Sequence, residues 1–363
     1  MRRPLLLPLV PLYAAGLRLR EMRLQRGWEP TRRLTHPVIS IGNLSTGGSG
    51  KTPLATALAK LLSARGFHVH VLSRGYGRRS AVPLRVDLHG SADQYGDEPL
   101  LIAREAGVPV YVAPERYDAG RLAELEWATG HEGTPQGGFL TGHDFSRAET
   151  QQEEEGALAP ASARHVHILD DGFQHRQLAR DIDILLLNRE DWHDDLLPAG
   201  NLREPVQAAR RASVLGIPAD DPAFEPELRS WGWNGPIWRI RRHMEIPEID
   251  GPVAAFCGIA RTEQFFAGLE SAGLKLATRT AFPDHHIYTT RDVESLVTRA
   301  RSDGARGFIT TEKDQVRLGK LASAFPFDLS LKTAPLTIEI EEEPIALDWL
   351  TARLAASRAA VSV

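Results

Sequence analysis

A stretch near the start of the chain has the residue types and spacing of a phosphate-binding loop. Its members are Ser45, Thr46, Gly47, Gly48, Ser49, Gly50, Lys51 and Thr52. Glycines let successive backbone N–H groups turn toward phosphate oxygens, and the N-terminus of a following helix adds a positive dipole. Lys51 would hold the β- and γ-phosphates of a nucleoside triphosphate, and the Thr52 hydroxyl would ligate Mg²⁺. The stretch departs from the GxxxxGK[ST] pattern at its first position, where Ser45 replaces glycine.

Two carboxylates follow a mostly apolar run later in the chain. The run 165–169 leads directly into Asp170 and Asp171. At the end of a strand beside the phosphate loop, either carboxylate could hold Mg²⁺ through water. Taken alone, two aspartates after a strand are equally typical of a helix cap or a turn. Together with the phosphate loop they indicate a metal and nucleotide site.

Three further polar strings could bind a substrate, and each has an ordinary alternative. The basic string 74–79 follows a strand end, where arginines suit anionic groups, but it could equally be an exposed loop. The acids of 96–99 stand at a helix start, which helix capping explains by itself. The string 284–286 contains two histidines, yet no further ligand set with zinc spacing accompanies it.

The elements around these motifs alternate between strands and helices. Largely apolar strands are expected at 38–41, 67–72, 108–112, 166–169 and 182–187, and helices at 53–64, 98–105 and 118–127. This alternation predicts an α/β fold with a doubly wound, mostly parallel sheet of the P-loop NTPase type. The polar stretch 129–164 has no clear period, and we expect it to be a flexible insertion.

A second, smaller α/β domain is expected to begin near residue 236. Its predicted strands are 253–257 and 307–310, and its predicted helices are 262–272, 291–302 and 346–358. The predicted organisation is therefore an N-terminal segment at 1–33, a P-loop domain at 34–235 and a smaller domain at 236–363. A chain of 363 residues is long enough for two packed cores.

The segment 1–33 is both basic and apolar. It holds eight arginines and two acids, and its apolar stretch is too short and too rich in proline to span a membrane. We expect an amphipathic helix whose apolar face, including Leu12, Leu19 and Met22, is bordered by arginines and lies on anionic lipid. A signal peptide and an ordinary terminal helix packed on the domain are the alternatives.

Composition limits the remaining possibilities. The formal net charge is −4, so no overall positive field favours nucleic acid, and basic residues are not clustered with aromatic ones in the body of the chain. The single cysteine, Cys257, excludes an internal disulfide and a zinc site built from several cysteines. It stands in an apolar run and is expected to be a small core residue.

Seven strings together resemble the signature set of one enzyme family, the lipid A 4'-kinases. They occur in family order at 42–53, 73–78, 96–99, 169–175, 197–205, 282–285 and 311–314. The resemblance implies a two-domain P-loop kinase with its site in the cleft between the domains. It also implies transfer of the γ-phosphoryl of ATP, with Mg²⁺, to the 4'-hydroxyl of tetraacyldisaccharide 1-phosphate in lipid A biosynthesis. The place would be the cytoplasmic face of the inner membrane, where the basic N-terminal segment would associate with lipid.

The resemblance also implies roles for individual residues. Asp97 matches the catalytic aspartate of the family and His285 the histidine that pairs with it. Glu98, Asp170 and Asp171 match acids near the metal and the nucleotide. Positions that line the substrate site are matched by Tyr76, Arg78, Arg116, Arg203 and Glu204. The chain departs from the family at Asn201, where a proline is expected, and at 258–262, which is looser than Gly-Ile-Gly-Asn-Pro.

These roles make chemical sense. A sugar hydroxyl is a poor nucleophile at neutral pH, and a carboxylate that receives its proton contributes about 10²–10⁴-fold in rate. A neighbouring histidine would orient and tune that carboxylate. Because Asp97 and His285 come from different predicted domains, we expect domain closure to assemble the pair.

Two other functions fit part of the same pattern. A P-loop NTPase switch would need the phosphate loop and Asp170-Asp171 but no acceptor hydroxyl and no basic apolar N-terminus. A soluble small-molecule kinase would phosphorylate a sugar without detergent or lipid. The expected partners are the glycolipid substrate and the membrane surface, with no nucleic acid and no protein partner inferred.

Overall fold

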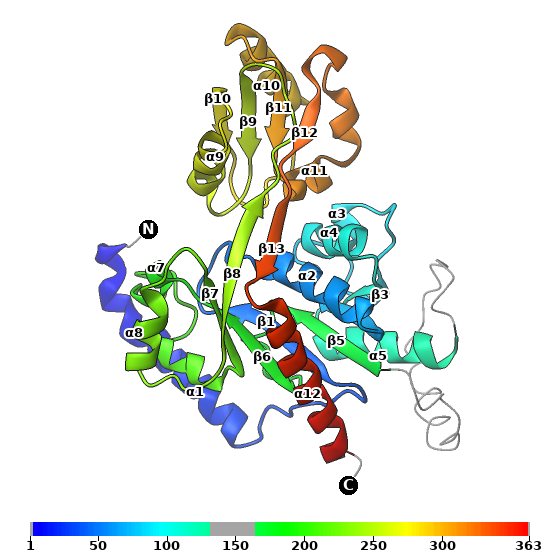
Figure 1. Ribbon diagram of the computed structural model, residues 1–363, viewed down its shortest axis with the longest axis vertical. Coiled ribbons are helices and arrows are strands. Elements are labelled where there is room, and N and C mark those ends of the chain that lie inside the picture. The colour runs from blue at the N-terminus through cyan, green and yellow to red at the C-terminus, as the bar shows by residue number, and fades with distance from the viewer. Residues whose placement is uncertain (1–2, 131–163, 362–363) are drawn as a thin grey trace.

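The structure is a computed structural model, and it describes residues 3–130 and 164–361 as two α/β units (Figure 1). The larger unit contains a nine-stranded sheet and the smaller unit a four-stranded sheet. The insertion predicted at 129–164 lies outside the described residues except at its two ends.

The large sheet has parallel strands in its interior and antiparallel strands at both edges. Its order is β13-β8-β7-β6-β1-β5-β2-β4-β3, and only β13 and β3 pair in antiparallel fashion. The bounds are Val38–Asn43 for β1, Phe67–Ser73 for β2, Leu84–Arg85 for β3, Val110–Val112 for β4, Arg164–Asp170 for β5, Ile182–Leu186 for β6, Val214–Pro218 for β7, Ile237–Met244 for β8 and Leu336–Ile340 for β13. The prediction of an α/β fold with a mostly parallel sheet is confirmed.

Helices cover both faces of this sheet, which explains why its central strands are apolar on both sides. The face that contributes Ile39 and Ile41 packs against α2 (Lys51–Ala64), α4 (Asp97–Ala106) and α12 (Glu343–Val361). The other face packs against α5 (Arg116–Ala128), α7 (Arg189–Trp192) and α8 (Phe224–Ser230). Two short helices, α3 (Ala92–Tyr95) and η2 (Val206–Arg211), lie in the connections.

The smaller unit is a parallel sheet of order β10-β9-β11-β12 with helices around it. Its strands are β9 (Val253–Cys257), β10 (Leu276–Ala281), β11 (Gly307–Thr310) and β12 (Leu331–Thr333). Its helices are α9 (Thr262–Ser271), α10 (Thr290–Ser302), α11 (Glu312–Leu318), η3 (Gly319–Ala324) and η4 (Phe327–Leu329). Cys257 is fully buried in this core, and burial raises the pKa of its thiol to about 12, as suits a core residue without reactivity.

The boundary expected at residue 236 differs from the structure. β8 pairs with β7, β13 pairs with β8, and α12 buries Leu347 and Leu350 in the core of the larger unit. The smaller unit is therefore formed by residues between β8 and β13. These two strands run side by side between the units and carry the chain out and back (Figure 1).

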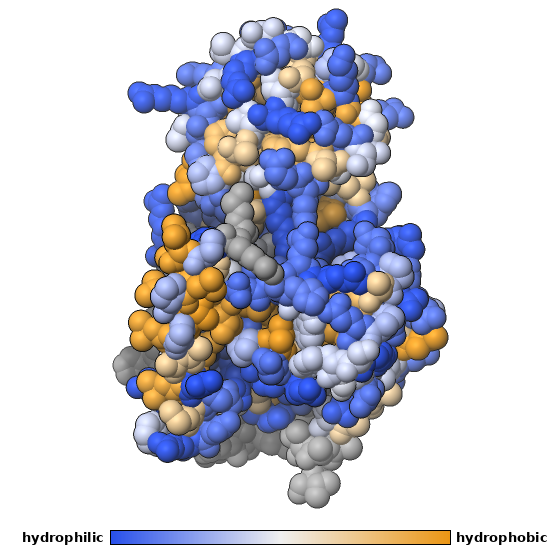
Figure 2. Space-filling view, turned by 90° about the vertical axis from the view of Figure 1, so that its left-hand side faces the viewer, coloured by the Kyte–Doolittle hydropathy of each residue, from blue (hydrophilic) through white to orange (hydrophobic). Residues whose placement is uncertain are grey.

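The N-terminal segment forms η1 (Pro4–Leu9) and then α1 (Val10–Gln25). One side of α1 contacts the larger unit, because the Tyr13 hydroxyl donates to the Arg203 carbonyl at 2.9 Å and Arg20 donates to the Gln174 carbonyl at 2.6 Å. Large apolar side chains remain exposed along the segment at Leu5, Leu7, Leu9, Leu12, Leu19 and Met22. Figure 2 shows hydrophobic residues gathered on this side of the molecule. Across residues 3–130 and 164–361, no helix is long and apolar enough to cross a membrane.

The packing of α12 on the larger unit gives a stability prediction. Leu350 is fully buried in that core, so Leu350→Ala should lower the free energy of unfolding by about 2–5 kcal/mol. Ile345 stands on the same helix but is 66% exposed, so Ile345→Ala should change it by less than about 1 kcal/mol. Urea unfolding measures both, and equal losses in the two variants would contradict the packing.

Candidate active site

The predicted phosphate loop connects the carboxyl end of β1 to the start of α2. Gly47 and Gly50 have φ values of +130° and +86°, a region that favours glycine. Gly50 directly precedes the first residue of α2, Lys51. The loop therefore leads directly into a helix N-terminus, as the prediction of a phosphate-binding loop expects.

Polar contacts from other segments hold this loop in place. The Ser45 hydroxyl donates to Asp191 Oδ2 at 2.7 Å, and the Thr46 N–H donates to the Asn201 carbonyl at 2.8 Å. Arg242 of β8 donates to the Ser49 carbonyl. Ser45 is fully buried, and its hydroxyl makes a contact with Asp191 that a glycine at this position could not make.

Lys51 lies among groups that a nucleotide would replace. Its Nζ is 3.1 Å from Asn43 Oδ1 and 3.5 Å from Asp171 Oδ1. The Asp171 carboxylate also accepts from Arg203 at 3.0 Å. Burial alone would raise the pKa of Asp171, but the charges of Lys51 and Arg203 outweigh it and hold the pKa below its usual value. Asp171 is therefore ionised and stands in for anionic phosphate beside Lys51.

Asp170 has a different environment from its neighbour. Its side chain is buried, and within the described residues its Oδ1 has no hydrogen-bond partner. Burial, together with the charges of Glu98 and Asp171, raises its pKa to about 7. An orphaned buried oxygen of this kind suits a cation.

The described residues form no cluster of three histidines, cysteines or carboxylates that could cage a metal. This fits Mg²⁺, which uses one or two carboxylates and completes its shell with water and substrate phosphates. Thr52 is buried at the start of α2, Asp170 offers its free oxygen, and Asp171 lies beside Lys51. The fourth predicted metal-site residue, Glu98, forms an ion pair with Lys313 instead.

Asp97 and His285 are in contact although they belong to different units. His285 Nδ1 is 3.3 Å from Asp97 Oδ2, and Arg317 Nε donates to the same oxygen at 2.7 Å. Burial of Asp97 opposes ionisation, but the bond to His285 and the charges of Arg317 and Lys313 hold its pKa well below the usual range. The same bond raises the pKa of His285. Asp97 is thus a buried carboxylate that stays ionised.

The structure places Asp97 and His285 in contact across the two units, and the role of domain closure in assembling this pair stays a prediction. The start of α4 and the helix α11 lie against each other at the junction of the units (Figure 1). Lys313 of α11 pairs with Glu98, and Arg317 pairs with Asp97. These two ion pairs join the start of α4 to α11 beside the contact between Asp97 and His285.

The predicted substrate-lining residues fall into two groups. The ring of Tyr76 lies 5.0 Å from that of His285, Arg116 donates to the Asp171 carbonyl at 3.3 Å, and Arg203 contacts the Asp171 carboxylate. Arg78 instead donates to the Val82 carbonyl in its own loop, and Glu204 accepts from Arg211 at 2.6 Å. The structure therefore brings the first three toward the other site residues.

Comparisons with known proteins identify the family of the chain. The family model for tetraacyldisaccharide-1-P 4'-kinase matches residues 2–355. The chain belongs to this family.

Individual relatives cover most of the chain. A tetraacyldisaccharide 4'-kinase from Koribacter versatilis is 37% identical over 354 residues, which cover 92% of this chain and 96% of the relative. One from Anaeromyxobacter dehalogenans is 37% identical over 88% of this chain and 82% of the relative. A crystal structure described as "apo" form LpxK from Aquifex aeolicus in complex with ATP aligns with a TM-score of 0.67 and 31% identity, over 96% of this chain and 98% of that one.

Sequence reasoning missed several residues of this kinase site. Arg317 was not singled out, although it stands four residues after Lys313, so both lie on the face of α11 that contacts α4. That spacing was a usable signal. Asp191 and Arg261 were missed as well, and their contact joins residues 70 positions apart. No local sequence pattern predicts a contact between residues so far apart in the chain.

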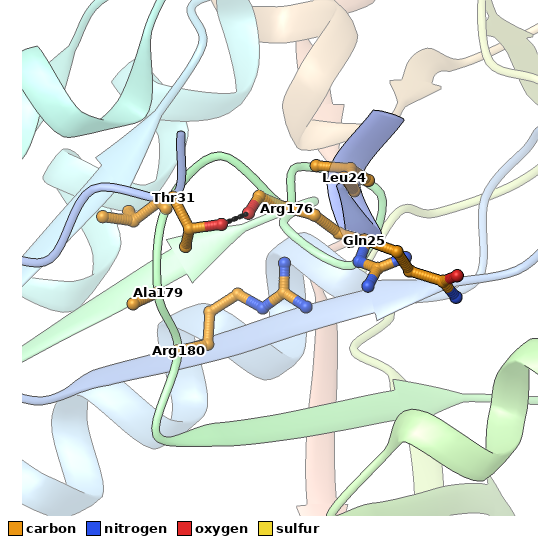
Figure 3. A pocket seen from close by; sticks show the side chains of 7 residues that line it. Leu24, Gln25, Thr31, Arg176, Ala179 and Arg180 are labelled. Carbon is orange, nitrogen blue, oxygen red and sulfur yellow. Dashed lines mark hydrogen bonds between the residues drawn. The ribbon is translucent and has the colours of Figure 1, made fainter. Parts of the chain in front are cut away.

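A cavity of about 260 Å³ lies elsewhere, under the end of α1 (Figure 3). Its lining consists of Leu24, Gln25, Thr31, Arg176, Leu178, Ala179 and Arg180. None of these is a predicted site residue. Arg176 pairs with Glu21, and Arg180 pairs with Asp183, so each arginine at this cavity already has a carboxylate partner.

The contact between Asp97 and His285 gives a prediction for pH titration. Asp97→Asn removes the carboxylate that raises the pKa of His285, and Arg317 remains 3.3 Å from the ring and opposes its protonation. The pKa of His285 should therefore fall in this variant. Proton NMR of the imidazole signal measures it, with the signal assigned by its loss in His285→Gln. An unchanged pKa would contradict the contact.

Proposed function

We propose that this protein transfers the γ-phosphoryl of ATP to the 4'-hydroxyl of tetraacyldisaccharide 1-phosphate. The observation that carries the proposal is the buried, ionised Asp97, which His285 and Arg317 hold at the start of α4, where the charge of Lys51 acts on the adjacent Glu98. A nucleotide switch has no need of a carboxylate prepared in this way. Membership of the tetraacyldisaccharide 4'-kinase family supports the choice of acceptor.

The nucleotide is held by the phosphate loop. Lys51 exchanges its contact with the Asp171 carboxylate for contacts with the β- and γ-phosphates, which are also negatively charged. Thr52, Asp170 and Asp171 are the residues that hold Mg²⁺, with Glu98 close to Asp170. When bound, Mg²⁺ neutralises charge on the phosphates. Burial and the charges of Glu98 and Asp171 raise the pKa of Asp170 to about 7, and a cation bound beside this carboxylate would favour its ionised form.

Asp97 receives the proton of the attacking hydroxyl. A strongly acidic carboxylic acid is a weak base toward a free sugar hydroxyl, but the hydroxyl becomes acidic as its bond to phosphorus forms. Because Asp97 stays ionised at neutral pH, it is ready at that moment. His285 orients the carboxylate through its Nδ1, and Tyr76 packs beside the imidazole and shields one side of it.

The substrate is positioned by the basic residues at the site. Arg116 and Arg203 both lie at Asp171, and guanidinium groups bind phosphate and sugar oxygens through paired N–H donors. Arg78 and Glu204 remain predictions for this role, because their present partners are Val82 and Arg211.

The N-terminal segment docks the protein on the cytoplasmic face of the inner membrane. Its exposed leucines project away from the larger unit, and the segment is rich in arginine. Apolar side chains that enter the lipid boundary and arginines that face anionic head groups favour the same position. This places the enzyme where a tetraacylated substrate resides.

A phosphate-transfer assay tests the reaction. Purified protein is mixed with Mg²⁺, γ-labelled ATP and tetraacyldisaccharide 1-phosphate in detergent micelles. We expect labelled lipid from the wild type and a loss of about 10²–10⁴-fold in Asp97→Ala. Asp303→Ala removes an exposed acid from the end of α10 and should retain full activity.

Other outcomes of this assay would select a different function. Release of phosphate without labelled lipid under every micelle condition would favour an NTPase switch. Equal labelling of a soluble sugar without detergent would favour a soluble kinase. Labelled lipid that persists in Asp97→Ala would keep the kinase and remove Asp97 as its base.

Vesicle binding tests the membrane role separately. Replacement of Leu9, Leu12 and Leu19 by serine should lower partitioning into anionic vesicles by tenfold or more, since each buried leucine contributes about 1.5–3 kcal/mol. The control replaces Leu88, Phe327 and Ile345, which are also exposed but lie elsewhere, and should leave partitioning unchanged. Equal effects in the two triple variants would contradict the membrane role of the N-terminal segment.

A further inference from the structure

A second contact between the units lies at the phosphate loop. Arg261 follows the carboxyl end of β9 in the smaller unit and directly precedes α9. Its Nη2 donates to both carboxylate oxygens of Asp191, each at 3.2 Å. Asp191 belongs to α7 of the larger unit and also accepts from the Ser45 hydroxyl at 2.7 Å. One carboxylate thus joins the first residue of the loop to an arginine of the other unit.

The guanidinium of Arg261 lies beside Gly47 of the loop. A Cβ placed on Gly47 would be 4.0 Å from Arg261 Nε and 3.8 Å from Ala260 Cβ. Arg242 donates to the Ser49 carbonyl of the same loop. The pKa of Arg242 is lowered, first by burial and then by the charge of Arg261, so the two cations are near each other. Two positive groups therefore border the place where a triphosphate would lie.

Arg261 is held at one nitrogen only. Within residues 3–130 and 164–361, the hydrogen bonds of its side chain are the two from Nη2 to Asp191. Its Nε and Nη1 remain available as donors, and the side chain is 20% exposed. A guanidinium anchored on one edge has a restricted orientation and can present its other edge to a phosphate.

We propose that Arg261 is a catalytic residue that contacts the γ-phosphate of ATP from the smaller unit. The inference rests on the proposed function and adds to it a residue in the 258–262 segment, where the chain departs from the family sequence. During transfer, negative charge is spread over the three equatorial oxygens of the γ-phosphoryl group. A guanidinium supplied in cis stabilises that charge, as arginine fingers do in other P-loop enzymes. Asp191 sets the orientation of Arg261 and couples it to Ser45.

Three variants test the assignment: Arg261→Ala, Arg261→Lys and, as a control, Arg241→Ala, which removes an exposed neighbouring charge on β8. We expect kcat to fall at least 100-fold in Arg261→Ala and less in Arg261→Lys, since arginine fingers contribute about 10³–10⁵-fold. Added guanidinium chloride should restore part of the activity of Arg261→Ala. Arg241→Ala should behave like the wild type.

A binding measurement without lipid separates this inference from the kinase assignment. Titration calorimetry with MgATP and MgADP should show that Arg261→Ala weakens ATP binding about tenfold more than ADP binding, because the lost contact is to the γ-phosphate. If the wild type fails to label lipid yet this discrimination appears, the kinase assignment falls and the arginine contact stands. If the wild type labels lipid and Arg261→Ala binds ATP and ADP as the wild type does, only the arginine proposal falls.

Asp191→Asn distinguishes phosphate contact from a mere link between the units. If the ion pair only fastens the units, Asp191→Asn should reproduce the whole loss of Arg261→Ala, and guanidinium should restore nothing. That result would overturn the proposal. If Arg261 contacts phosphate, Asp191→Asn should retain more activity than Arg261→Ala. Thermal unfolding of each variant without ligand identifies any loss that comes from misfolding.

Discussion

Two ion pairs join the first turn of α4 to α11 and fix the geometry on which the rest of the site depends. Arg317 binds Asp97 and Lys313 binds Glu98, and all four side chains are buried or half-buried. Charges removed from water are costly, and loss of one partner of a buried pair typically costs about 3–5 kcal/mol. The arrangement is therefore intolerant of separation. It keeps Asp97 ionised, holds His285 against it, and brings the smaller unit to the edge of the phosphate loop.

The neighbouring aspartates Asp170 and Asp171 at the end of β5 differ in the direction of their pKa shifts. Asp171 touches Lys51 and Arg203 and has a lowered pKa, whereas Asp170 is buried without such a partner and has a pKa of about 7. A bound triphosphate would attract Lys51 away from Asp171, and a bound cation would supply Asp170 with the positive partner that its buried carboxylate needs. The ionisation of the two neighbouring aspartates is thus set separately by the groups that contact each of them.

Much of the fold could be predicted because its strands are locally apolar and its helices have a clear period. The strands predicted at 253–257 and 307–310 have the bounds that the structure gives to β9 and β11. The domain boundary at 236 could not be predicted in the same way. β8 and β13 are separated by more than 90 residues of intervening chain, and their pairing is set by contacts with each other and with β7. Local pattern carries no information about which sheet such a strand will join.

The sequence by itself determined the family to which the chain belongs. It also predicted the phosphate loop and the two aspartates after β5, because glycines, lysine and carboxylates at fixed spacing have a direct chemical meaning. It also supplied Asp97 and His285 by resemblance. Only the tertiary structure decided that this pair is in contact, that Arg317 holds it, and that Asp191 binds Arg261 beside the loop. Those contacts join side chains from separate elements, and their distances follow from how the two units pack across β8 and β13. The tertiary structure also decided the ionisation of Asp97, Asp170 and Asp171, because their burial and their neighbouring charges arise only when the chain is folded.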